Sequence, residues 1–89
     1  HLPPPGKCRV WIPGTPPGHQ PKAGPCSVVA QSIPRGAWLI TRTSTDKKNV
    51  RVQFYDERRS GFIVAVGLYD AKSGALVEDL SSKKKYAGK

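Results

Sequence analysis

The feature that most constrains this chain is the stretch of residues 6–26, in which two cysteines enclose a run rich in proline and glycine. Eight of the nine prolines lie between Leu2 and Pro25. Proline fixes φ and removes a backbone N–H group, so regular helix and central strand are both disfavoured here. We expect an extended arm with turns at its Pro-Gly steps, because glycine supplies the positive φ that a type II turn needs. A proline-free island at residues 8–12 (CRVWI) is expected to contact the core.

The cysteine count predicts how this arm is held. Cys8 and Cys26 are the only cysteines, and an even count in a small domain predicts one disulfide, formed in an oxidising compartment. A chain of 89 residues buries a modest core, which a covalent link supports. A loop of this size gives roughly 3 kcal/mol of stabilisation. The sequence therefore predicts an exported protein, periplasmic or extracellular, and we expect a mature or trimmed form because the chain begins at His1 and has no long apolar run.

From residue 27 onward the composition is that of β-strands. The predicted strands are residues 27–33 and 37–43, joined as a hairpin by Pro34-Arg35-Gly36, then 50–56, 62–69 and 75–80. Residues 62–69 (FIVAVGLY) are apolar on both faces, which predicts the middle of the sheet, and Gly67 indicates a bulge or bend. Residues 70–74 are predicted to form a hairpin loop with Gly74 in a left-handed conformation.

These elements predict a mainly β fold: a single small, curled antiparallel sheet of about five strands, barrel-like or a sandwich. The expected organisation is an arm at residues 1–26 that is closed by the disulfide and packs on the domain, a β domain at 27–80, and a disordered basic tail at 81–89. A helix near residues 73–85 is the alternative to the last strand, but that segment lacks a continuous apolar stripe.

Charge indicates the kind of partner. The net charge is +9, which favours binding to phosphate-rich polymers, anionic lipids or acidic cell-wall polymers. The candidate binding residues are cations and aromatic side chains: Arg9, Trp11, Arg42, Arg51, Tyr55, Arg58 and Arg59. Together with Trp38, several of them could also serve a nucleic-acid-binding small β-barrel, although no RNP-like motif or recognition helix is present. Trp38 itself lies among apolar residues and is expected to be in the core.

Reaction chemistry is not indicated. His1 and His19 lie in the proline-rich arm, and the cysteines are expected to be paired, so no nucleophile has a base beside it. The carboxylates fall at turns or near the end of the chain. A metal site from Cys8, His19, Cys26 and His1 would make this a metal-binding periplasmic protein, but the spacing matches no closed module. We predict that the chain is not an enzyme, has no catalytic residues, and uses no cofactor or metal.

The front of the chain resembles a loosely defined group of small exported proteins and lipoproteins of proteobacteria. The shared stretch is Pro-Pro-Gly-x-Cys-Arg-x-Trp-x-Pro-Gly-x-Pro-Pro-Gly-x-Gln-Pro, followed by a second cysteine and by β-hairpins. The matching residues are Pro4, Pro5, Gly6, Cys8, Arg9, Trp11, Pro13, Gly14, Pro16, Pro17, Gly18, Gln20 and Pro21, with Cys26 as the second cysteine. The resemblance implies residence in the cell envelope and brings no catalytic residues or ligand. A lipid anchor would require a cysteine upstream of residue 1.

The function predicted from these observations is a non-enzymatic binding or scaffolding module of the bacterial cell envelope, whose basic face meets an anionic polymer or an envelope protein. Nucleic acid is the alternative partner. The arm has a second expected role, which is to pack on its own domain and cover an edge strand of the sheet.

Overall fold

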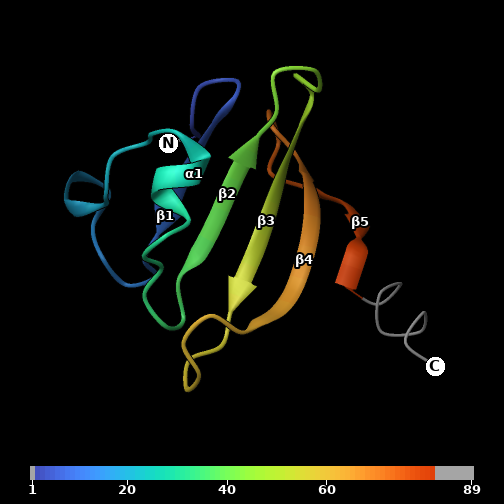
Figure 1. Ribbon diagram of the computed structural model, residues 1–89. Helices are drawn as coiled ribbons and strands as arrows, with labels where there is room; N and C mark the ends of the chain where they lie inside the picture. Colours follow the sequence, from blue (N-terminus) through green and yellow to red (C-terminus); the bar gives the residue numbers. More distant parts are fainter. Residues whose placement is uncertain (1, 82–89) are drawn as a thin grey trace.

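The protein is built on one antiparallel sheet in which every strand pairs with its neighbours in the sequence, in the order β1-β2-β3-β4-β5 (Figure 1). The computed structural model describes residues 2–81. The strands are β1 (Lys7–Trp11), β2 (Trp38–Arg42), β3 (Asn49–Tyr55), β4 (Ile63–Asp70) and β5 (Leu76–Asp79). Helix in this part of the chain comprises a 3-10 turn, η1 (Pro17–His19), a single turn, α1 (Cys26–Val29), and the residues Leu80 and Ser81 directly after β5. The predicted mainly β fold is confirmed, and the sheet is open rather than closed into a barrel.

The strands expected after residue 36 all form, but the strand expected at residues 27–33 does not. That segment begins with α1 because the Pro25 carbonyl accepts from the N–H groups of Val28 at 3.0 Å and Val29 at 2.9 Å. The β-branched pair Val28-Val29 favoured a strand, yet Pro25 stands at the N-cap position, where its missing N–H removes no helical hydrogen bond. The turn at Pro34-Arg35-Gly36 forms as expected, but it leads from this segment into β2 instead of closing a hairpin.

The strand that replaces the one expected at residues 27–33 comes from the arm. The island expected to contact the core is β1, which pairs with β2 from Lys7↔Arg42 to Trp11↔Trp38. The predicted disulfide between Cys8 and Cys26 is present. Two of the Pro-Gly steps place glycine at positive φ, at Gly6 and Gly14, whereas the third lies in η1.

The arm also covers the outer edge of β1. Cys8 and Gly24 exchange backbone hydrogen bonds of 2.9 and 3.0 Å. Beyond them, the buried Gln20 side chain accepts from the Ile12 N–H at 2.7 Å and donates to the Ile12 and Thr15 carbonyls, each at 2.8 Å. The amide of Gln20 thus satisfies the backbone of Ile12, the residue after β1, and the expected role of the arm as an edge cover is seen in the bonds between Cys8 and Gly24.

The strand expected at residues 62–69 forms, but the prediction that it lies in the middle of the sheet is wrong. The middle strand of the sheet is β3, and β4 is the fourth. The first half of β4 is exposed on its surface, with Ile63 at 43% and Val64 at 57%. The reason is the shortness of β5, which has four residues and pairs with β4 only from Gly67 to Tyr69. The expected hairpin loop before β5 forms, with Gly74 at a φ of 77°.

Apolar side chains gather on both faces of the sheet. On the first, here called the arm face, Cys8, Val10, Ala37 and Leu39 are buried under residues of the arm and α1, including Cys26 and Val29. On the second, here called the groove face, Ile40, Val50 and Val52 are buried among aromatic side chains. Alternation along each strand produces this division. The described residues include no helix long and apolar enough to cross a membrane. The basic tail expected at 81–89 lies, except for its first residue, outside the described residues.

Candidate binding groove

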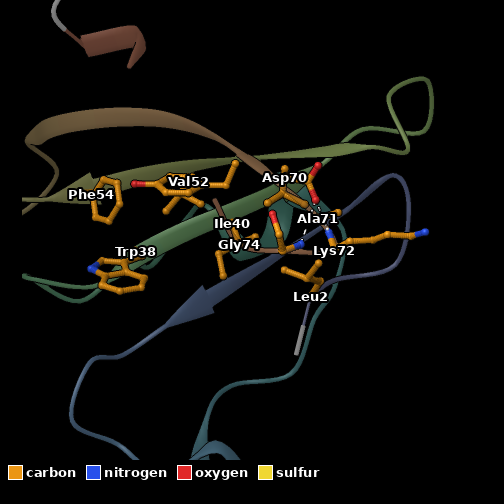
Figure 2. Close-up of a pocket in the computed structure, with 12 residues that line it drawn as sticks. Leu2, Trp38, Ile40, Val52, Phe54, Asp70, Ala71, Lys72 and Gly74 are labelled. Atoms are coloured by element: carbon orange, nitrogen blue, oxygen red, sulfur yellow. Dashed lines mark hydrogen bonds between the residues drawn. The ribbon is translucent and has the colours of Figure 1, made fainter. Parts of the chain in front are cut away.

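The groove face carries a cavity of about 470 Å³ (Figure 2). Its walls come from three neighbouring strands, from the loop between β4 and β5, and from the N-terminal end of the arm. The lining residues are Leu2, Trp38, Ile40, Val50, Val52, Phe54, Tyr69, Asp70, Ala71, Lys72, Ser73 and Gly74. Most of these side chains are apolar, so the groove suits a ligand that itself presents apolar surface.

Three aromatic side chains, one from each of the strands β2, β3 and β4, form a row across this face. Trp38 and Phe54 are directly paired across the strands, with ring centroids 5.1 Å apart in an edge-to-face arrangement. Phe54 and Tyr69 follow at 6.4 Å, again edge to face. Such pairs hold one another in position. Each ring is only half-buried, so part of its surface remains open to a ligand.

The floor of the groove lies beside this row and consists of Ile40, Val50 and Val52, which are all buried. Register explains why they meet: Ile40 pairs with Val52, and Val50 pairs with Tyr69. Alternation then brings Phe54 to the same face as both valines. The floor is therefore aliphatic, and the aromatic side chains pack against it.

The position of the Tyr69 ring depends on the absence of a side chain at Gly67. A Cβ atom at Gly67 would lie 2.7 Å from Cε1 of Tyr69, closer than real Cβ contacts allow. The missing side chain therefore leaves the space that the ring occupies on β4. The ladder with β5 shifts register between Leu68 and Tyr69, so the irregularity that the sequence predicted at Gly67 is found one residue further on.

The arm closes one end of the groove. In Figure 2, Leu2 lies near Ala71 and Lys72, away from the Trp38 and Phe54 end. Pro3 is fully buried next to it, and its carbonyl accepts a hydrogen bond of 3.4 Å from Nη1 of Arg42. Leu2 of this chain is thus already seated against the groove, with the buried Pro3 beside it in the sequence.

The opposite end opens into a second hollow of about 500 Å³ that shares Trp38 and Phe54 with the groove. Its other walls are Gly36, Tyr55, Asp56, Glu57, Arg58 and Val64. Here the lining is charged as well as apolar. The two hollows together make a surface that runs along the sheet, apolar in the middle and polar at the β3–β4 end.

The candidate binding residues from the sequence lie in three different places. Arg9, Trp11 and Arg42 are on the groove face, as their pairing with Ile40, Trp38 and Lys7 requires. Arg51 and Tyr55 are on the other side by alternation, and Tyr55 packs against the core of the arm face, where burial raises its pKa. Arg58 and Arg59 are in the β3–β4 loop.

Two of these arginines have roles within the fold. Nε of Arg9 donates to the Pro21 carbonyl at 3.0 Å, which links β1 to the part of the arm that follows it. Arg59 lies over the Phe62 ring, with Cζ 4.2 Å from the centroid, and its Nη2 is 3.9 Å from Oδ2 of Asp56. Of the five candidate arginines, Arg9 and Arg42 share the groove face, whereas Arg51 lies on the other face and Arg58 and Arg59 lie in a loop.

From the sequence, Trp38 was predicted to be a core residue, and Phe54 and Tyr69 were not predicted to contact a ligand. The alternation at residues 50–56 did show that Val50, Val52 and Phe54 share a face. The register with β2 and β4, which brings Trp38 and Tyr69 beside Phe54, is not encoded in any one strand.

Metal ligands do not gather in the described part of the chain. Within residues 2–81 no group of three or more His, Cys, Asp or Glu side chains is close enough to hold a metal ion. Cys8 and Cys26 form the disulfide, so their sulfurs are not thiolates, the form in which cysteine binds metals.

No known protein family matches the chain. Neither a curated protein nor a solved structure matches it.

Proposed function

We propose that this protein is a non-enzymatic binding module that works outside the cytoplasm, and that its ligand surface is the groove lined by Trp38, Phe54 and Tyr69. The observation that carries the proposal is this row of half-exposed aromatic rings over an aliphatic floor, in a cavity of about 470 Å³. Pockets of this kind, apolar with a few polar groups at their ends, are where proteins bind ligands.

The partner that this groove suits is an extended, proline-containing segment of another protein. Aromatic-lined grooves recognise such segments because polyproline II chains are stiff and lose little entropy on binding. The seating of Leu2 at one end supports the same chemistry, since an apolar side chain next to a buried proline already packs there. The Arg42 guanidinium donates a hydrogen bond to the Pro3 carbonyl, and carbonyls of a polyproline II chain need such outside donors because the chain has no internal hydrogen bonds.

The disulfide supports a location outside the cytoplasm, because disulfides persist in oxidising compartments. The resemblance to small exported proteins of proteobacteria agrees with a place in the cell envelope. Among the partners expected from the sequence, an envelope protein fits this groove better than an anionic polymer. The cations at Arg51, Arg58 and Arg59 are spread over the far face and a loop, so they offer no continuous track for a polyanion or a nucleic acid.

The test is an NMR titration with two synthetic peptides, one containing Leu-Pro-Pro-Pro and one with serine in place of each proline. We expect the proline peptide to shift the resonances of Trp38, Phe54 and Tyr69 in a saturable manner and the serine peptide to shift them weakly. Phe54→Ala should weaken binding about tenfold or more, the loss expected when a stacking aromatic contact is removed.

The matched control is Phe62→Ala, because Phe62 is 53% exposed and lines neither hollow. It should leave peptide binding unchanged. Absence of shifts at millimolar peptide, or shifts confined to other surfaces, would refute the proposal. If a single-stranded oligodeoxynucleotide saturates the same resonances in a salt-resistant manner, the partner is a nucleic acid and the protein assignment is wrong, since binding through phosphates alone decays steeply with salt.

A further inference from the structure

The two edges of the sheet differ in how well they are protected. The outer edge of β1 is covered by backbone bonds between Cys8 and Gly24, and the side chain of Gln20 bonds to the backbone of Ile12, the residue after β1. At the opposite edge, β5 pairs with β4 only from Gly67↔Asp79 to Tyr69↔Leu76. Within residues 2–81, the first half of β4, residues 63–66, is therefore paired on its β3 side alone. Figure 1 shows β4 extending well past the end of β5.

This open half-edge is apolar and uncharged. Its sequence, with the residue before it, is Phe62-Ile63-Val64-Ala65-Val66. Phe62 is 53% exposed, Ile63 43% and Val64 57%. Proteins commonly protect an edge strand with lysine, proline or a covering segment, because unpaired N–H and C=O groups invite another strand. Here the side chains themselves favour pairing, since β-branched residues suit a strand.

We propose that residues 62–66 are a self-association site, at which the β4 edges of two copies of this chain pair antiparallel across a two-fold axis. Centring the pairing on Val64 sets Phe62 of each copy opposite Val66 of the other. The same surface patch is used twice, as a two-fold interface requires. The result is one sheet that continues through both copies.

Charge is the reason to choose a second copy as the occupant. The β3–β4 loop, which carries Arg58 and Arg59, lies at the start of the open half-edge, and the end of β5, which carries Asp79, lies at its finish. Antiparallel pairing brings the start of each edge to the finish of the other. The basic loop of one copy then lies beside Asp79 of its partner copy, in addition to the two bonds that Asp79 accepts from the N–H and hydroxyl groups of Ser81 within its own chain. The uncharged strand between these ends brings no like charges together, although each chain carries a net charge of +9.

The association leaves the groove available. The apolar groove is lined by Trp38, Phe54 and Tyr69, and none of residues 62–66 lines it. Val64 lines the second hollow next to the groove. A dimer of this kind would present two grooves to one partner, and linked sites bind with higher avidity than one. The site itself does not depend on what the groove binds.

The experiment is sedimentation equilibrium of the full chain over a range of concentrations. We expect a reversible dimer for the wild type. Ile63→Lys places a charge on the open edge and should weaken the dimer about tenfold or more, as lysine does on natural edge strands. Val28→Lys is the matched control, because Val28 is 60% exposed in α1, away from this edge, and it should leave the dimer unchanged.

The register has its own test. Arg59→Asp and Asp79→Lys should each weaken the homodimer, because each puts like charges at both ends of the pairing, whereas an equimolar mixture of the two variants should form a heterodimer that native mass spectrometry detects. A wild type that stays monomeric at millimolar concentration would overturn the proposal. So would a dimer that survives Ile63→Lys but is lost in Phe54→Ala, since that result would place the interface in the groove. Should Asp79→Lys fail to fold, Ile63→Lys and Arg59→Asp still decide the question.

Discussion

Gly67 is the residue on which the shape of the groove depends most directly. Gly67→Ala would set a methyl group 2.7 Å from Cε1 of Tyr69, so the ring must leave its position over β4. We expect a loss of about 1–3 kcal/mol in the free energy of unfolding, as for other overpacked sites. Urea denaturation measures it, and the aromatic NMR resonances of Tyr69 and Phe54 should shift because their rings are in contact.

Gly18→Ala is the matched control for this substitution. No atom lies within 4 Å of a Cβ built at Gly18, and its φ is not positive. Such a change leaves stability unaltered or raises it slightly, by about 0.4–1 kcal/mol, because alanine restricts the unfolded chain. If Gly67→Ala were as stable as Gly18→Ala with Tyr69 unmoved, the explanation given for Gly67 would be wrong.

Single residues also show which features of the groove could be predicted from the sequence. Glycine inside an apolar strand predicted an irregularity at Gly67, and alternation predicted the shared face of Val52 and Phe54. Trp38 was predicted to be a core residue because its sequence neighbours are apolar. Its half-exposed position beside Phe54 depends on cross-strand register, which only the assembled sheet defines.

At the level of elements, the three connections between β2 and β5 share one construction. Each contains, or in the case of Asp70 directly follows, an aspartate that accepts the backbone N–H groups two and three residues later. Oδ1 of Asp46 accepts from Lys48 and Asn49, that of Asp56 from Arg58 and Arg59, and that of Asp70 from Lys72 and Ser73. Aspartate favours turns for this reason. The carboxylates that the sequence placed at turns thus shape the turns themselves.

This construction predicts a loss of stability in acid. Hydrogen bonds lower the pKa of all three carboxyl groups: the side chain of Asn49 is the main cause for Asp46, the backbone N–H of Arg58 for Asp56, and that of Ser73 for Asp70. A pKa that is lower in the folded state gives stability above the unfolded value of about 3.9, and this stability is lost as the pH falls through the folded pKa. The melting temperature should therefore decrease steadily below about pH 4.

The triple variant Asp46→Asn, Asp56→Asn, Asp70→Asn separates this effect from the general repulsion among the cations at low pH. Asparagine keeps an acceptor for the turn but does not titrate, so the variant should show a weaker dependence of melting temperature on pH. Thermal unfolding followed by circular dichroism between pH 7 and pH 2.5 measures both proteins. Equal decreases in the two would show that these turns are not the source of the acid sensitivity.

Elements also mark where prediction from sequence failed. The β-branched pair Val28-Val29 predicted a strand, whereas Pro25 and the adjacent disulfide residue Cys26 begin a helical turn there. The strand that the sheet needed came instead from residues 7–11, inside the proline-rich arm. Local propensity identified both segments as apolar and β-favouring, and the pairing of residues 7–11 with β2 is a long-range contact that this propensity does not contain.

For the whole molecule, the sequence was sufficient for the mainly β class and for the disulfide. It did not determine that the sheet is open, because closure depends on the length of β5 and on what covers each edge. Nor did it show that the arm face and the groove face are covered unequally. Ile12, Cys26 and Val29 pack on the arm face, while the groove face meets the arm only at Leu2 and keeps its aromatic rings half-exposed.

That unequal cover leads to a prediction about the disulfide. Replacing Cys8 and Cys26 together with alanine should lower the free energy of unfolding by roughly 3 kcal/mol, because the unfolded chain regains the entropy of an open loop. Guanidinium denaturation of the variant and of the oxidised wild type measures the difference. The groove lies on the opposite face from Cys8, so the folded variant should retain the Trp38 to Phe54 ring contact and its near-UV circular dichroism signal. Loss of that signal in a variant that still has its far-UV β spectrum would mean that the arm, and not the sheet alone, holds the groove in shape.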